Sequence, residues 1–186
     1  MEKKLAAAEA LGRCDQAAVA ATLTRINFST SLEGEAGKVG IVFEVVSEDL
    51  SLKRQIFSCL DANAGDQVIL ASNTSSYNIG ELADAASRHR EQVIGAHWSP
   101  SPITPCVEVV VSRYTAPSVL ETTMALMKRV GKFPTRCKSA PGFVANRIQF
   151  AMAAEACADG AADRIKRERD ERLYDRLNIF RKEQNL

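Results

Sequence analysis

The sequence has almost no net excess of charge. Its 24 lysine and arginine residues are nearly balanced by 23 aspartate and glutamate residues, which leaves a net charge of only +1. Proteins that bind nucleic acid through phosphate contacts are usually far more basic. We therefore expect no nucleic-acid partner.

Long hydrophobic runs are lacking as well. Apolar runs such as residues 41–43 are far shorter than the roughly 20 apolar residues that a membrane-spanning helix needs. The first residues, Met-Glu-Lys-Lys, lead into an alanine-rich helical pattern rather than into the apolar core of a signal peptide. We therefore expect no signal peptide and no membrane partner.

Paired cysteines are also missing. No two of the five cysteines lie at Cys-X-X-Cys spacing, and they are scattered along the chain: Cys14, Cys59, Cys106, Cys137 and Cys157. This spacing favours neither a zinc site nor redox chemistry, so we expect no metal. Such cysteines are typical of small apolar side chains in a reducing compartment, and we expect a cytoplasmic protein.

The sequence does have the composition of a globular protein, because 46% of its 186 residues are hydrophobic and 25% are charged. Strand-like apolar runs alternate with helical patterns along most of the chain. We expect strands at residues 39–46, 67–71, 92–96, 107–111 and 133–137, and helices at residues 51–60, 79–86, 118–130 and 142–158. This alternation predicts an α/β fold with a doubly wound, mostly parallel sheet.

The two ends of the chain follow other patterns. Before the first expected strand of the sheet we expect helices at residues 2–11 and 15–23, a β-type run at residues 26–30, and a turn containing Gly34, Gly37 and Gly40. Residues 163–186 are rich in charges of both signs around a narrow apolar stripe, which indicates an exposed helix.

Polar residues follow several of the expected strands. Glu48 comes after residues 39–46, a polar turn at residues 72–76 follows the next strand, and His97 follows the strand that ends at residue 96. Because ligands bind at the carboxyl ends of the strands in doubly wound sheets, we expect these side chains to lie near one site.

The chain has only two histidines. His89 lies between two arginines, and we expect it to be a solvated surface residue. His97 is well placed to act as a base, and Glu108 is a lone carboxylate inside an apolar strand. A buried carboxylate needs a partner, and an imidazole is a natural one. The alternatives are that His97 is structural and that Glu108 pairs with an arginine or faces solvent.

Six segments now resemble, in order, those of the L-3-hydroxyacyl-CoA dehydrogenase family. They are Phe-Glu-Val-Val-Ser-Glu-Asp-Leu-Ser-Leu-Lys (43–53), Ala-Ser-Asn-Thr-Ser-Ser (71–76), Ile-Gly-Ala-His-Trp-Ser-Pro (94–100), Pro-Cys-Val-Glu-Val-Val (105–110), Gly-Lys (131–132) and Pro-Gly-Phe-Val-Ala-Asn-Arg (141–147). The resemblance implies an incomplete Rossmann-like fold with a helical C-terminal extension. It also implies NAD-linked oxidation of the 3-hydroxyl group of an acyl-CoA, a step of fatty acid metabolism and β-oxidation.

The same resemblance implies roles for individual residues. His97 would take the hydroxyl proton, and Glu108 would stabilise the imidazolium that forms. Ser75 would hydrogen-bond the reacting oxygen beside the nicotinamide, and Asn146 would hold the same part of the substrate.

A second group of residues is expected near the cofactor. The resemblance places Glu48, Lys53 and Asn73 there together with Ser75, and Lys53 would also meet the phosphates of CoA. Without the resemblance, Glu48 reads as a charge at the start of a helix and Lys53 as a solvated lysine.

The sequence departs from the family in three places. It lacks the first strand and the Gly-X-Gly-X-X-Gly loop, whose backbone N–H groups bind the diphosphate of NAD in the family. Gly34, Gly37 and Gly40 do not form this loop, because they lead into a strand and the family's loop leads into a helix. The loop after His97 is one residue shorter than the family pattern, and only 40 residues follow Asn146. We therefore expect a truncated chain. Residues 1–141 would form a partial NAD-binding domain. Residues 142–186 would form a helical remnant of the family's C-terminal domain, which serves substrate binding and dimerisation.

Two alternatives remain open beside this dehydrogenase. One is a catalytically inactive fragment or assembly module with the same fold, and the other is a related gulonate- or crystallin-like hydroxy-acid dehydrogenase. Because the sheet would lack two central strands, its apolar edges are expected to favour a homo-oligomer or other self-association.

Overall fold

The computed structural model of the chain describes residues 15–98 and 105–158. Contacts divide the chain into two units, Met1–Leu32 and Glu33–Leu186. In the first unit, helix α2 (Gln16–Leu23) begins at Asp15, whose side chain accepts a hydrogen bond from the backbone N–H of Ala18. The expected helix at residues 2–11 and the charged tail at residues 163–186 lie outside the described residues, and the domain boundary at residue 141 stays a prediction.

The strand expected at residues 26–30 is wrong, because this segment has no regular structure. A β-type run becomes a strand only when another strand pairs with it, and none of the described strands pairs with this one. The glycine-containing turn is also partly wrong, since Gly34 lies inside the short helix α3 (Leu32–Ala36). Only Gly37 and Gly40 lie in the turn that leads to the sheet.

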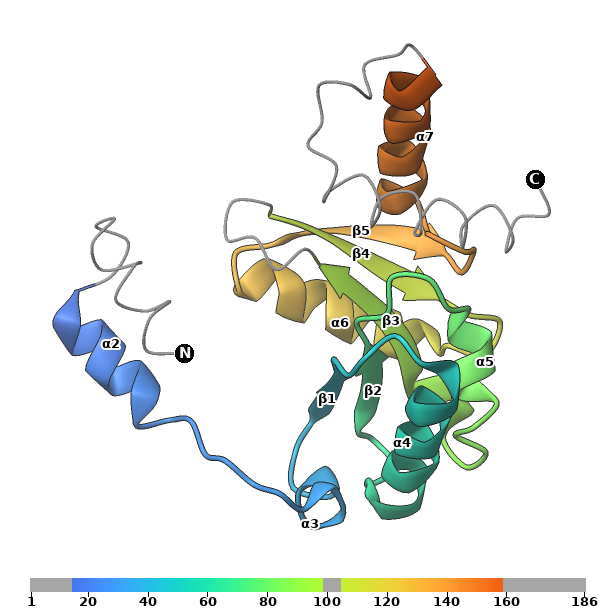
Figure 1. Cartoon of the computed structure of the whole chain (residues 1–186). Coiled ribbons are helices and arrows are strands. Elements are labelled where there is room, and N and C mark those ends of the chain that lie inside the picture. The colour runs from blue at the N-terminus through green and yellow to red at the C-terminus, as the bar shows by residue number, and fades with distance from the viewer. Residues whose placement is uncertain (1–14, 99–104, 159–186) are drawn as a thin grey trace. The chain divides into compact units, whose positions relative to one another are not determined.

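Five strands form one sheet in the order β1-β2-β3-β4-β5 (Figure 1). They are β1 (Ile41–Glu44), β2 (Ile69–Ser72), β3 (Val93–Trp98), β4 (Cys106–Val111) and β5 (Phe133–Lys138). Strands β1, β2 and β3 run parallel, β4 is antiparallel to β3, and β5 is parallel to β4. The prediction of an α/β fold with a mostly parallel sheet is thus confirmed.

Helices cover both faces of this sheet. They are α4 (Leu50–Asn63), α5 (Ile79–Ala83) and α6 (Pro117–Arg129), with a short 3-10 turn η1 (Arg90–Gln92) before β3 and helix α7 (Ala145–Ala158) after β5. Phe57 of α4 and Leu82 of α5 belong to one hydrophobic cluster, and Val119 of α6 belongs to the other. Both faces are therefore buried at the central strands, which explains why β2, β3 and β4 read as nearly continuous apolar runs.

Helix α4 carries two charged residues, Lys53 and Asp61, on its buried face. Asp49 caps its first turn by accepting a hydrogen bond from the N–H of Leu52 at 3.0 Å. Its buried positions are Lys53, Phe57, Leu60 and Asp61, which recur at helical spacing on one face. Among the helices of the described residues, none is long and apolar enough to cross a bilayer.

Candidate active site

The antiparallel pairing of β3 with β4 brings the predicted base and its carboxylate together. In this register His97 lies directly opposite Glu108. The Nδ1 atom of His97 is 2.8 Å from Oε2 of Glu108, and their side chains are only 13% and 5% exposed. The alternatives of an arginine partner or a solvent-facing carboxylate for Glu108 are wrong.

The surroundings of Glu108 determine which atoms carry protons. Burial by itself raises the pKa of this carboxyl, but hydrogen bonds from His97 and from the backbone N–H groups of Ala145 and Val144 outweigh it and lower the pKa below its ordinary value. Glu108 is therefore ionised and can only accept, so Nδ1 of His97 is the donor. In neutral His97 the other ring nitrogen, Nε2, is then free to accept a proton.

Ser75 lies on the open side of the imidazole. Its Oγ is 3.3 Å from Nε2 of His97, so the serine hydroxyl donates to the neutral ring. Asn146, from the first turn of α7, donates from Nδ2 to the backbone oxygen of Ser75 at 3.2 Å. The structure thus brings together all four residues that were predicted as catalytic: His97, Glu108, Ser75 and Asn146.

Glu108 also holds the start of α7. Its Oε1 atom accepts hydrogen bonds from the N–H groups of Val144 at 2.8 Å and Ala145 at 2.9 Å. The turn before the helix places Gly142 and Phe143 in the left-handed region, with φ angles of 71° and 47°. The ring of Phe143 lies 5.6 Å from that of His97.

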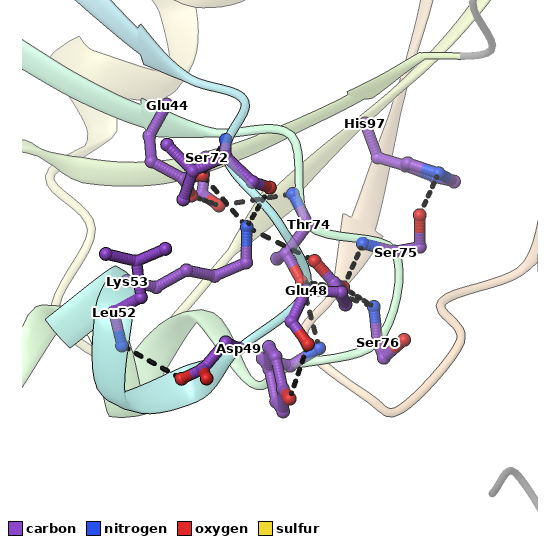
Figure 2. Close-up of polar contacts among 12 residues, drawn as sticks. Glu44, Glu48, Asp49, Leu52, Lys53, Ser72, Thr74, Ser75, Ser76 and His97 are labelled. Carbon is purple, nitrogen blue, oxygen red and sulfur yellow. Dashed lines mark hydrogen bonds and ion pairs between the residues drawn. The ribbon is translucent and has the colours of Figure 1, made fainter. Parts of the chain in front are cut away.

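The serine turn that follows β2 is fastened by Glu48 (Figure 2). The Oε1 atom of Glu48 accepts from the hydroxyl of Thr74, from the N–H of Ser75 at 2.8 Å and from the N–H of Ser76 at 3.1 Å. Burial raises the pKa of Glu48, but the hydrogen bonds from Thr74 and Ser75 and the charge of Lys53 lower it below its ordinary value overall. Glu48 is therefore an ionised acceptor that shapes this turn.

Asn73 and Lys53 contact other residues of the protein. The side-chain oxygen of Asn73 accepts from the N–H of Trp98 at 3.0 Å, which ties the serine turn to β3. Lys53 is only 1% exposed, and its Nζ lies 2.9 Å from Glu44 and 3.2 Å from Glu48. The reading of Lys53 as a solvated lysine is wrong, whereas its contact with cofactor or CoA phosphates stays a prediction.

Sequence reasoning missed Glu44, which completes this charged cluster. Its Oε2 accepts from the hydroxyl of Ser72 at 2.6 Å, and its Oε1 accepts from Lys53. Glu44 is the one carboxylate in the apolar run at residues 39–46, the same signal that identified Glu108. That signal was available and could have identified Glu44.

The expectation for His89 is also wrong. Its side chain is buried, with Nδ1 2.9 Å from Asp61 and Nε2 3.1 Å from Asp66. Asp61 in turn accepts from the backbone N–H groups of Arg88 and His89. His89 therefore fastens a loop to α4 and takes no part in the site around His97. The loop after His97, at residues 99–104, lies outside the described residues.

Glu48 and Ser75 are the residues here that are suited to hold part of a dinucleotide and its substrate. Glu48 keeps 37% of its side chain exposed beside the turn of Ser75, at the carboxyl ends of β1 and β2. At this edge a carboxylate suits the hydroxyl groups of a ribose, and a serine hydroxyl suits the reacting oxygen of a substrate. The sequence contains no Gly-X-Gly-X-X-Gly loop for the diphosphate, so the fit covers one half of the cofactor.

Comparisons of the sequence with known proteins point to one family. The family model described as "3-hydroxyacyl-CoA dehydrogenase, NAD binding domain" matches residues 1–140. The mitochondrial hydroxyacyl-coenzyme A dehydrogenase of Sus scrofa is 37% identical over 136 residues, which are 73% of this chain and 43% of that protein. The 3-hydroxybutyryl-CoA dehydrogenase of Clostridioides difficile is 33% identical over 177 residues, 93% of this chain and 62% of that protein.

Solved structures give the same picture. The chain is similar to FadB2 of M. tuberculosis, with a TM-score of 0.81 and 31% identity over 89% of this chain and 59% of that one. It is similar to the (S)-3-hydroxybutyryl-CoA dehydrogenase PaaH1 of Ralstonia eutropha, with a TM-score of 0.80 and 34% identity over 90% and 59% of the two chains. The chain thus spans about half the length of the curated relatives that it matches.

Proposed function

The chain belongs to the 3-hydroxyacyl-CoA dehydrogenase family, and we propose that it oxidises the 3-hydroxyl group of an acyl-CoA to a ketone with NAD as the hydride acceptor. Such a reaction would place it in fatty acid metabolism, in β-oxidation or its reverse. The observation that carries this proposal is the connected chain from Glu108 through His97 to Ser75.

The proton of the substrate hydroxyl goes to His97. With Nδ1 donating to Glu108, the lone pair of Nε2 points toward Ser75 and can take this proton. The imidazolium that results lies 2.8 Å from an ionised carboxylate, which lowers the free energy of the charged ring. Bound NAD would supply the acceptor for the hydride from carbon 3, so both hydrogens that the alcohol loses are accounted for.

Neutral groups hold the alcohol in place. The hydroxyl of Ser75 lies next to Nε2 of His97, where a substrate oxygen would contact both atoms. Asn146 supports the backbone of Ser75 from α7. Because a serine hydroxyl and an amide do not compete for the proton, they position the substrate without acting as a second base.

The test is turnover of the purified chain. We expect NADH to be consumed with acetoacetyl-CoA, the reverse direction of the same reaction. His97→Gln should lower kcat about a thousandfold, because general base catalysis contributes roughly 10²–10⁴-fold. His89→Gln is the matched control, since it makes the same change at the other histidine, which contacts Asp61 and Asp66.

Two results would contradict the proposal: equal turnover in the parent and in His97→Gln, or no binding of NADH at millimolar concentration. The second result would favour the alternative function of an inactive module that keeps the site. That alternative draws support from the missing diphosphate loop, which supplies the main backbone donors for NAD in such folds.

A further inference from the structure

A buried ion pair lies directly behind the serine turn. Glu44 of β1 and Lys53 of α4 are each 1% exposed at the side chain, and Oε1 of Glu44 is 2.9 Å from Nζ of Lys53. Desolvating two charges costs several kcal/mol per ion, so a buried pair is weak support for stability by itself. The contacts around the pair indicate what else it does.

We propose that Glu44 and Lys53 are positioning residues, which hold Glu48 and the serine turn so that the hydroxyl of Ser75 faces His97. The inference rests on the proposed function, because it assigns these residues to the geometry of that reaction. Neither side chain touches the ring of His97, so both act through other residues.

The first route runs through Lys53. Its Nζ contacts Oε2 of Glu48 at 3.2 Å, while Oε1 of the same carboxylate accepts from the N–H groups of Ser75 and Ser76. One oxygen of Glu48 therefore faces the lysine and the other faces the turn (Figure 2). Because Glu48 is 37% exposed, loss of the ammonium group would leave its Oε2 atom to water, with only the bonds of Oε1 to the turn holding the carboxylate.

The second route runs through Ser72. Oε2 of Glu44 accepts from the hydroxyl of Ser72 at 2.6 Å, and the same hydroxyl oxygen accepts from the N–H of Thr74 at 3.1 Å. Thr74 is the residue before Ser75 and donates its own hydroxyl to Glu48. Glu44 thus contacts the serine turn through Ser72, whereas Glu48 contacts it directly.

The loop that carries Glu48 is held by the same two residues. Oε1 of Glu44 accepts from the N–H of Val46 at 2.7 Å, and Nζ of Lys53 donates to the backbone oxygen of Val46 at 3.3 Å. Both loops of this edge therefore share one buried anchor. A disturbance at Glu44 is expected to move Glu48 and Ser75 together.

The test uses two isosteric substitutions and their combination in the full chain. Glu44→Gln removes the carboxylate charge, Lys53→Met removes the ammonium group, and the double variant leaves neither charge unpaired. Each single variant is expected to shift the urea midpoint of unfolding downward, because it removes one half of the buried Glu44–Lys53 ion pair and leaves the other half in place. In the double variant most of that shift should be recovered.

The decisive readout is the ¹⁵N spectrum of the histidine rings. The chain has only two histidines, so the loss of signals in His97→Gln assigns both rings. We expect the Nε2 signal of His97 to move in all three variants, including the double variant with recovered stability. The signals of His89 should stay in place in these three variants. The control is Asp61→Asn, which alters a buried carboxylate paired with His89, and in this control the signals of His97 should stay in place.

Turnover gives a second readout. We expect kcat to fall about tenfold to a hundredfold in Glu44→Gln and in the double variant, with KM within about twofold, because misplacement of a positioned group costs that much in rate. Unchanged His97 signals and unchanged kcat in a folded Glu44→Gln or double variant would overturn the proposal. Moved His97 signals in a chain without turnover would support positioning and count against the proposed function.

Ser72→Ala keeps the test decisive if the charge variants do not fold. It removes one hydroxyl that links Glu44 to Thr74 and changes no charge. We expect a smaller shift of the same His97 signal, and an unchanged signal in this variant would contradict the second route.

Discussion

At the scale of single residues, Glu108 contacts both His97 and the start of helix α7. One of its oxygens faces His97, and the other accepts from the N–H groups of Val144 and Ala145 at the start of α7. Its lone position in an apolar strand was enough to predict a buried partner, because an unpaired carboxylate is too costly to bury. The sequence could not indicate the contact with α7, since residues 144 and 145 lie 36 and 37 positions away.

The lowered pKa of Glu108 predicts how stability depends on pH. A carboxyl whose pKa is lower in the folded chain contributes stability above its unfolded pKa, which is about 4.5 here, and loses that contribution as the pH falls through the folded value. We expect Glu108→Gln to lower the free energy of unfolding by about 2 kcal/mol at pH 7. The difference from the parent should shrink toward pH 3.

Urea unfolding at pH 7, 5, 4 and 3 measures this effect. Glu121→Gln is the control, because Glu121 is an exposed residue of α6 and should change the free energy of unfolding little at any of these pH values. A penalty for Glu108→Gln that stays constant from pH 7 to pH 3 would show that the carboxylate charge does not contribute.

His89 shows where reasoning from neighbouring residues fails. The two flanking arginines suggested solvent, yet the ring is held by Asp61 and Asp66, 28 and 23 positions earlier in the chain. Only the packing of α4 against the following loop brings these carboxylates close. A polar local sequence therefore did not reveal a buried, hydrogen-bonded imidazole.

Among elements, strands and helices with internal patterns were predicted well. Strand β4 and helix α6 follow from their own residues, because a nearly continuous apolar run and helical spacing are local properties. The run at residues 26–30 failed because pairing is not local. The antiparallel direction of β4 could not be predicted from the sequence either, although this direction places Glu108 opposite His97.

Strand β3 contains a glycine two residues before His97. A Cβ atom at Gly95 would lie 2.8 Å from Cβ of Val110 and 2.9 Å from Cδ1 of Ile79, so β4 and α5 both approach too closely for any side chain. We expect Gly95→Ala to lower stability by about 1–3 kcal/mol, the usual range for overpacking. Thermal unfolding followed by circular dichroism measures it.

Gly40→Ala is the matched control for this substitution. Gly40 lies directly before β1, and an added Cβ there meets nothing within 4 Å. Its melting temperature should stay close to that of the parent. Equal melting temperatures for both alanine variants would show that the contacts around Gly95 can yield.

At the scale of the whole molecule, the two edges of the described sheet differ. The edge strand β5 contains Pro134 and the charged residues Arg136 and Lys138, which discourage pairing with another strand. The opposite edge strand, β1, reads Ile-Val-Phe-Glu, and its glutamate is buried. Exposed valines flank it: Val39, Val45 and Val46 are 40%, 61% and 38% exposed.

This asymmetry leads us to propose self-association through β1. Val45→Lys places a charge next to β1, at the edge of the described sheet, so we expect it to shift the purified chain toward the monomer in sedimentation velocity at matched concentrations. Val130→Lys is the control, because Val130 is 59% exposed after α6 and should leave the association unchanged. A parent chain that is monomeric at 100 μM would refute the proposal.

The turn before α7 connects this helix to His97 through Glu108. The left-handed residues Gly142 and Phe143 bend the chain there, and Glu108 accepts both from the base and from the first turn of the helix. The helix and the imidazole are thus coupled, because both are hydrogen-bonded to the same carboxylate. Any tilt of α7 that breaks its bonds to Glu108 changes the electrostatic setting of His97, even if nothing touches the ring itself.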